Sequence, residues 1–161
     1  MKLFLSSTSV EAFKTLREVG KKAGDWETVR ANALKALESE EKISALIEIA
    51  LEEGDVTCAL AWLPRVKTGG WYTRDYKLEV ARAAEKNHPQ AAITLYQELA
   101  ERAINNRSRG AYQRAVDYLK RAKKLSGRLN GGAEWQGYLQ NLRMRYPTLR
   151  AFQQELIKAR L

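Results

Sequence analysis

Residues 89–104, PQAAITLYQELAERAI, and residues 110–125, GAYQRAVDYLKRAKKL, decide the fold. In both stretches apolar residues recur three and four positions apart, which is the period of an α-helix with one buried face. Only the polar residues Asn105 to Arg109 separate the two patterns. A connection this short predicts two neighbouring antiparallel helices, and we expect this helical hairpin to be the unit that the chain repeats.

The same helical period recurs along the rest of the chain, between short turns marked by glycine, aspartate or proline. Gly24 and Gly54 each precede an aspartate that can cap the next helix, and Pro147 ends another helical pattern. No run alternates apolar and polar residues over the length of a strand, so we expect an all-α protein of about nine helices. The predicted helices outside residues 89–125 cover residues 10–22, 26–39, 41–53, 56–63, 74–86, 133–146 and 148–159.

The length of 161 residues is that of one domain, which we expect to cover residues 1–161 with fraying at residues 1–9 and 159–161. Residues 64–72 are predicted to form an irregular loop that carries Trp71 and Tyr72. These two aromatic side chains are candidates for contact with a partner. Alternatively, both side chains could fold back onto a helix and cover part of the core.

Four segments share a step along their helices. They begin at Trp26, Val56, Pro89 and Tyr112, and each has a small or apolar residue three positions later and another apolar residue four positions further. These paired positions are Val29 and Ala33, Ala59 and Leu63, Ala92 and Tyr96, and Ala115 and Leu119.

This step resembles the second helix of a tetratricopeptide repeat (TPR). The intervals between the four starts are 30, 33 and 23 residues, whereas a TPR repeats at about 34 residues and carries a W-x2-L-G signature that is missing here. We therefore expect a degenerate, TPR-like right-handed solenoid of stacked antiparallel helical hairpins. A concave face of this kind suits binding better than catalysis.

Residues 91–125, AAITLYQELAERAINNRSRGAYQRAVDYLKRAKKL, and 134–156, EWQGYLQNLRMRYPTLRAFQQEL, carry a second resemblance. They are similar to the C-terminal helical region of bacterial SWIM zinc-finger family proteins, and the likeness extends over about residues 10–158. The family's zinc module has the pattern C-x-C followed by C-x-H, for which Cys58 and His88 are too few and too far apart. The resemblance thus implies a helical tail, or a standalone relative, without the zinc module. The family is thought to engage nucleic acids or proteins through that module.

The net charge of +9 is concentrated in the last two fifths of the chain. Residues 100–161 hold 14 Lys and Arg against 4 Asp and Glu, whereas residues 1–99 hold 14 against 15. Such asymmetry indicates an anionic partner for the basic part. The alternative is that the charge serves solubility alone.

The basic residues show one regular pattern, a series of arginines at seven-residue intervals. Seven residues of α-helix turn through about 700°, so successive arginines drift by only about 20° around the helix and rise by about 10 Å. They form a positive ridge that could meet phosphates or an acidic protein. The alternatives are a solvated helix face and pairing with acids on a neighbouring helix. We name as the basic ridge Arg107, Arg114, Lys120, Arg121, Lys124 and Arg128.

No residue pattern predicts catalysis or metal binding. The single cysteine, Cys58, falls on an apolar stripe and is predicted to be a buried core residue, and His88 falls at a helix start. The apolar run Leu3 to Leu5 is too short for a signal peptide, and no run has the length of a membrane span.

From these observations we expect a cytoplasmic, bacterial, non-enzymatic protein without cofactor, metal or membrane partner. We predict a protein–protein interaction or scaffolding module. The alternative is a nucleic-acid-binding accessory domain that uses the basic ridge within residues 107–128.

Overall fold

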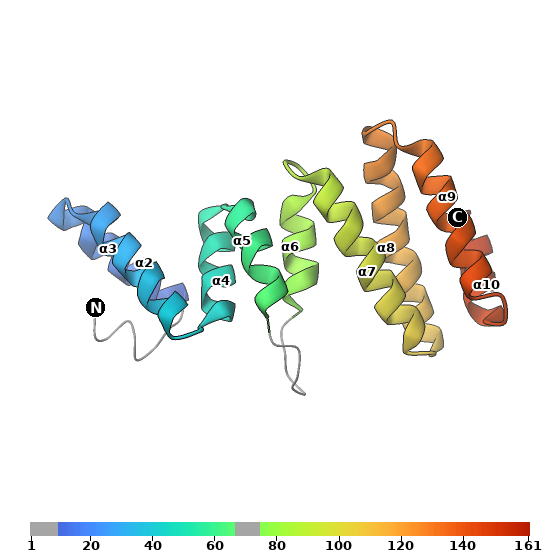
Figure 1. Ribbon diagram of the computed structural model, residues 1–161, viewed down its shortest axis with the longest axis horizontal. Helices are drawn as coiled ribbons and strands as arrows, with labels where there is room; N and C mark the ends of the chain where they lie inside the picture. Colours follow the sequence, from blue (N-terminus) through green and yellow to red (C-terminus); the bar gives the residue numbers. More distant parts are fainter. Residues whose placement is uncertain (1–9, 67–74) are drawn as a thin grey trace. The chain divides into compact units, whose positions relative to one another are not determined.

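The computed structural model describes residues 10–66 and 75–161, and in these ranges the protein is all-α, as predicted (Figure 1). Nine α-helices and one short 3-10 helix account for the regular structure there, and these ranges contain no strand. The α-helices are α2 (Val10–Ala23), α3 (Trp26–Ser39), α4 (Ile43–Glu53), α5 (Val56–Trp62), α6 (Tyr76–Ala84), α7 (Pro89–Asn105), α8 (Arg109–Arg128), α9 (Gly132–Arg145) and α10 (Arg150–Lys158).

The chain divides into two compact units, Met1–Tyr76 and Lys77–Leu161, which we call unit 1 and unit 2. The boundary falls near the start of α6. The single domain predicted over residues 1–161 stays a prediction, because compactness does not decide whether two units fold as one.

Unit 1 contains two helix pairs with the same turn. Gly24 and Gly54 end α2 and α4 with φ of +78° and +73°, a conformation that glycine adopts without the steric cost of a Cβ. An aspartate follows each glycine, and the Asp55 carboxylate accepts a hydrogen bond from the Cys58 backbone N–H at 3.0 Å, which caps α5. The two pairs therefore share the glycine–aspartate sequence and the left-handed glycine, whereas the Asp25 side chain makes no capping bond. Their fully buried side chains include Phe13, Ala33, Leu37 and Ile47.

Unit 2 is built around α7 and α8, which pack against each other along their lengths (Figure 1). The Ser108 hydroxyl begins α8 by accepting a hydrogen bond from the Ala111 N–H at 3.2 Å. Both helices bury a continuous apolar face, and α9 and α10 also pack on α8. Buried members of the two faces are Ala92, Leu95, Tyr96, Leu99, Ile104, Ala115, Leu119, Ala122 and Leu125.

Several predicted boundaries differ from the structure. Leu63–Arg65 form a 3-10 helix where the sequence predicted the end of a helix and the start of a loop. The fraying predicted for residues 159–161 stays a prediction; in the structure Leu161 is buried, and its N–H donates to the Leu156 carbonyl at 3.1 Å.

Candidate functional site

Unit 2 carries an open groove of about 780 Å³ along one side of α8. Residues from α6, from the turn after α6 and from about four successive turns of α8 line it. Six of the lining residues are basic and two are acidic, and we call it the basic groove. Its lining is Leu78, Arg82, Glu85, Arg114, Asp117, Tyr118, Lys120, Arg121, Lys124, Leu125 and Arg128.

The basic groove gathers five of the six residues of the basic ridge. Arg107 is the exception, because it lies in the turn between α7 and α8 with φ of +49°. Sequence reasoning missed Arg82 and Glu85, which α6 and the following turn place opposite α8. Their spacing from Leu78, four and seven residues, puts all three on one helical face and was the available signal.

Glu85 is the acidic centre of the groove. Its carboxylate oxygen Oε1 accepts hydrogen bonds from the Tyr96 hydroxyl at 2.5 Å and from Arg121 Nη1 at 2.8 Å. Arg128 Nη1 donates to the Glu85 backbone carbonyl at 3.4 Å. Arg121 is therefore paired with an acid of a neighbouring element, which was one of the alternatives to a ridge open to a ligand.

The aromatic rings beside this carboxylate are packed together. The guanidinium carbon of Arg121 lies 5.9 Å from the centre of the Tyr96 ring, and that ring stacks on Tyr118 with 6.3 Å between centres. Burial, together with the hydrogen bond to Glu85 and the charge of that carboxylate, raises the pKa of Tyr96 to about 12. The hydroxyl thus stays a hydrogen-bond donor over the whole physiological range.

The pKa of Glu85 is lowered from its ordinary value of 4.5. Partial burial opposes ionisation of the carboxyl group, but the hydrogen bonds from Tyr96 and Arg121 and the charges of Arg121 and Lys124 outweigh it. Because the folded pKa is below the unfolded one, ionised Glu85 stabilises the fold above the unfolded pKa. That contribution is lost as the pH falls through the folded pKa.

Replacing Glu85 with glutamine is therefore expected to lower the free energy of unfolding at neutral pH by about 1 kcal/mol, a charge-assisted bond discounted for its partial exposure. The loss should shrink as the pH falls through the lowered pKa of Glu85, because the wild-type carboxylate then also loses its charge. Urea unfolding across this pH range measures it. Glu134→Gln is the control, since Glu134 is exposed and has no ion pair among the described residues, and its profile should follow wild type. A pH-independent difference for Glu85→Gln would contradict the assignment.

Other cations of the groove have no such partner. Within the described part of the chain, Arg82, Arg114 and Lys124 make no ion pair, and Lys120 reaches only Asp117 on its own helix, at 4.0 Å. These side chains are exposed, so the groove presents net positive charge to solvent.

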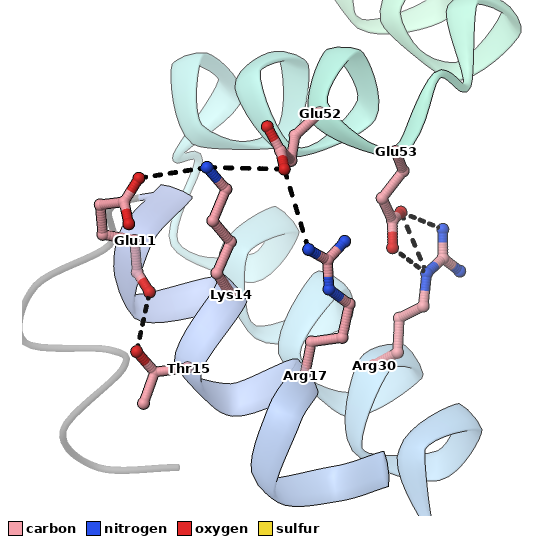
Figure 2. A network of polar contacts seen from close by, with 7 residues as sticks. All are labelled: Glu11, Lys14, Thr15, Arg17, Arg30, Glu52 and Glu53. Atoms are coloured by element: carbon pink, nitrogen blue, oxygen red, sulfur yellow. Dashed lines mark hydrogen bonds and ion pairs between the residues drawn. The ribbon is translucent and has the colours of Figure 1, made fainter.

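Three basic residues of unit 1, by contrast, pair with carboxylates of α4, as Figure 2 shows. Lys14 and Arg17 of α2 both reach the Glu52 carboxylate of α4, at 3.5 and 3.8 Å. Arg30 of α3 binds Glu53 through two nitrogens, Nη2 at 2.6 Å and Nε at 2.9 Å. These pairs tie α2 and α3 to α4, so the cations serve the fold and are not available to a ligand.

Cys58 corrects one prediction, because it is exposed. Ala59 takes the buried position of the α5 stripe, and the next residue toward the N-terminus turns about 100° away from it. A hydrogen bond to Asp55 and partial burial raise the pKa of the Cys58 thiol. The thiol is therefore a weak nucleophile at neutral pH.

The remaining candidate residues add no evidence for a functional site. Trp71 and Tyr72 lie outside the described residues, so their predicted partner contact stays a prediction. His88 occupies the N-cap position of α7 without a capping bond from its side chain.

Over residues 10–66 and 75–161, no cluster of three His, Cys, Asp or Glu side chains could hold a metal ion. Within the same ranges, no helix combines the length and apolar character that crossing a membrane requires.

Comparison with known proteins adds one relative. A stretch of 73 residues is 34% identical to "Uncharacterized protein YwqB" of Bacillus subtilis (strain 168). It covers 45% of this chain and 14% of that protein, so the chain is similar to a small part of a much longer one. No family model matches the chain. No solved structure matches it either.

Proposed function

We propose that this protein is a non-catalytic protein-interaction module. The observation that carries the proposal is the basic groove, an open concave surface whose Arg82, Arg114 and Lys124 make no ion pair within residues 10–66 and 75–161. Structural cations are normally paired within the fold, as in unit 1 (Figure 2). Exposed and convergent cations are the kind of group that recognises an anionic partner.

The arrangement that we propose for the helices is a TPR-like, right-handed stack of hairpins. The shared glycine–aspartate turns of unit 1 support it, as do Ala59, Ala92 and Ala115, which are fully buried where the repeat requires a small side chain. We also propose that the chain is the helical region of a SWIM zinc-finger protein, or a standalone relative of it, and acts in the cytoplasm. The long relative YwqB, of which the match covers a small part, is compatible with a region of a larger protein.

Photo-cross-linking tests the interaction proposal. Benzoylphenylalanine placed at Lys120 in the groove, or at Lys22 on α2 in unit 1, is irradiated in cells that express the protein. Both positions are exposed, so the probe should not disturb the fold. Nuclease-resistant protein adducts that reappear with the purified partner would support the module. A lack of protein adducts at either position would overturn it.

A nucleic-acid-binding accessory domain is the second candidate function, favoured by the five ridge residues that line one groove. Anisotropy of labelled DNA and RNA oligomers across a salt series distinguishes it. If the ridge neutralises phosphates, the logarithm of the binding constant should fall by about 0.9 per phosphate against the logarithm of salt concentration. Weak binding with a shallow slope would remove this candidate.

A further inference from the structure

We propose that the basic groove binds an acidic peptide segment, extended along α8, with its carboxylates paired to Arg114, Lys124 and Arg82. The inference rests on the proposed function and names the chemistry of the protein partner. Three features of the groove carry it: the spacing of its cations, the way it already holds one carboxylate, and the acids within its own lining.

The cation spacing matches an extended chain. Arg114 and Lys124, the two cations on α8 that the proposal uses, are ten residues apart, which is a rise of about 15 Å. An extended peptide advances about 3.3 Å per residue, so acidic residues four or five apart are separated by a similar distance, about 13 to 17 Å.

Glu85 indicates how a carboxylate is held. Its side chain receives hydrogen bonds from Tyr96 and Arg121 at 2.5 and 2.8 Å. The groove thus contains donors already oriented toward one carboxylate, and arginine is the side chain that best matches carboxylate geometry. Arg114 and Lys124 also line the groove and make no ion pair in the described ranges.

The groove's own acids favour a peptide over nucleic acid. Glu85 and Asp117 are both in the lining and would face a phosphodiester backbone that carries a charge at every nucleotide. A peptide can place neutral residues opposite them and acids opposite the cations. Proteins that bind single-stranded nucleic acids typically also stack the bases on aromatic rings. In residues 10–66 and 75–161 every aromatic side chain is buried or half-buried, and the Tyr118 ring already stacks on Tyr96.

The test is fluorescence anisotropy with a fluorescein-labelled peptide of about nine residues that has glutamate at every fourth position. The comparison probes are the same peptide with glutamine in those places and a single-stranded DNA oligomer of equal charge. Arg114→Glu/Lys124→Glu should weaken binding of the glutamate peptide at least about tenfold. The matched control, Lys22→Glu/Arg150→Glu, also changes two exposed cations outside the groove, and both variants lower the net charge from +9 to +5. It should stay within about twofold of wild type.

Glu85→Gln separates a groove that binds acids from a general charge effect. The substitution removes an acid that competes for Arg121, so the glutamate peptide should bind several-fold more tightly, beyond the small gain from one lost negative charge. Asp117→Asn measures that general gain, because it removes one carboxylate that does not hold Arg121.

Three results would overturn the inference: equal weakening by the two charge-reversal variants, equal binding of the glutamine peptide, or no gain from Glu85→Gln over Asp117→Asn. Tighter binding of the DNA oligomer, lost in Arg114→Glu/Lys124→Glu, would assign the groove to nucleic acid instead. The proposed function fails separately, because protein adducts from Lys22 would keep the module even if the groove does not bind the acidic peptide.

Discussion

Replacing Leu119 with alanine is expected to lower the free energy of unfolding of unit 2 by about 3 kcal/mol, within the range found for buried leucines. The Leu119 side chain is fully buried on α8, the helix against which α7, α9 and α10 all pack. Removing three carbons there sacrifices transfer free energy and leaves a cavity that helices packed on several sides cannot fill. Urea denaturation followed by far-UV circular dichroism measures the change.

The control for this prediction is Leu129→Ala, the same chemical change at the C-cap of the same helix. Leu129 is 43% exposed, so its loss should cost less than about 1 kcal/mol. Equal costs at the two positions would mean that Leu119 does not occupy the centre of the α7–α8 core.

Enlarging Ala115 to leucine is the second change with a large expected effect, a loss of about 2 kcal/mol in the free energy of unfolding. Ala115 is fully buried on α8, four residues before Leu119. It is the small member of a step that recurs at Ala92 on α7, where the side chain is also fully buried. A larger side chain has no space at such a position unless the helices move apart.

The same substitution at Ala151 provides the control, because Ala151 is exposed on α10. Its effect should lie within about 0.5 kcal/mol of zero, the usual range for a surface change. Thermal melting of both variants compares them directly. If Ala115→Leu were as stable as wild type, the small residue of the repeated step would not be needed for two helices to approach closely.

Helical period was enough to predict the all-α class and the main helices. The patterns of α7 and α8 are long and regular, and their polar connection, predicted at Asn105 to Arg109, covers residues 106–108 in the structure. Long amphipathic patterns are decided by burial of one face, which can be read locally. Short elements cannot be read locally in this way. Leu161, for example, is buried, and no local sequence pattern predicts its burial.

The basic groove was only half predictable. The period of seven located Arg114, Arg121 and Arg128 on one face of α8. The period could not predict which arginines form ion pairs. Arg121 pairs with Glu85, 36 residues earlier, whereas Arg114 has no ion pair in the described chain. Pairing across a groove depends on packing between helices, and a single sequence does not encode the register of that packing in any local pattern.

The exposure of Cys58 has a practical consequence. The chain has one cysteine, so a maleimide fluorophore or a nitroxide can be attached at one defined site in unit 1 without any substitution. Since the pKa of this thiol is raised, coupling should be run on the alkaline side of neutrality, where the reactive thiolate is more abundant. The same protonated state slows adventitious oxidation during storage, so the unlabelled protein should remain free of disulfide-linked dimers.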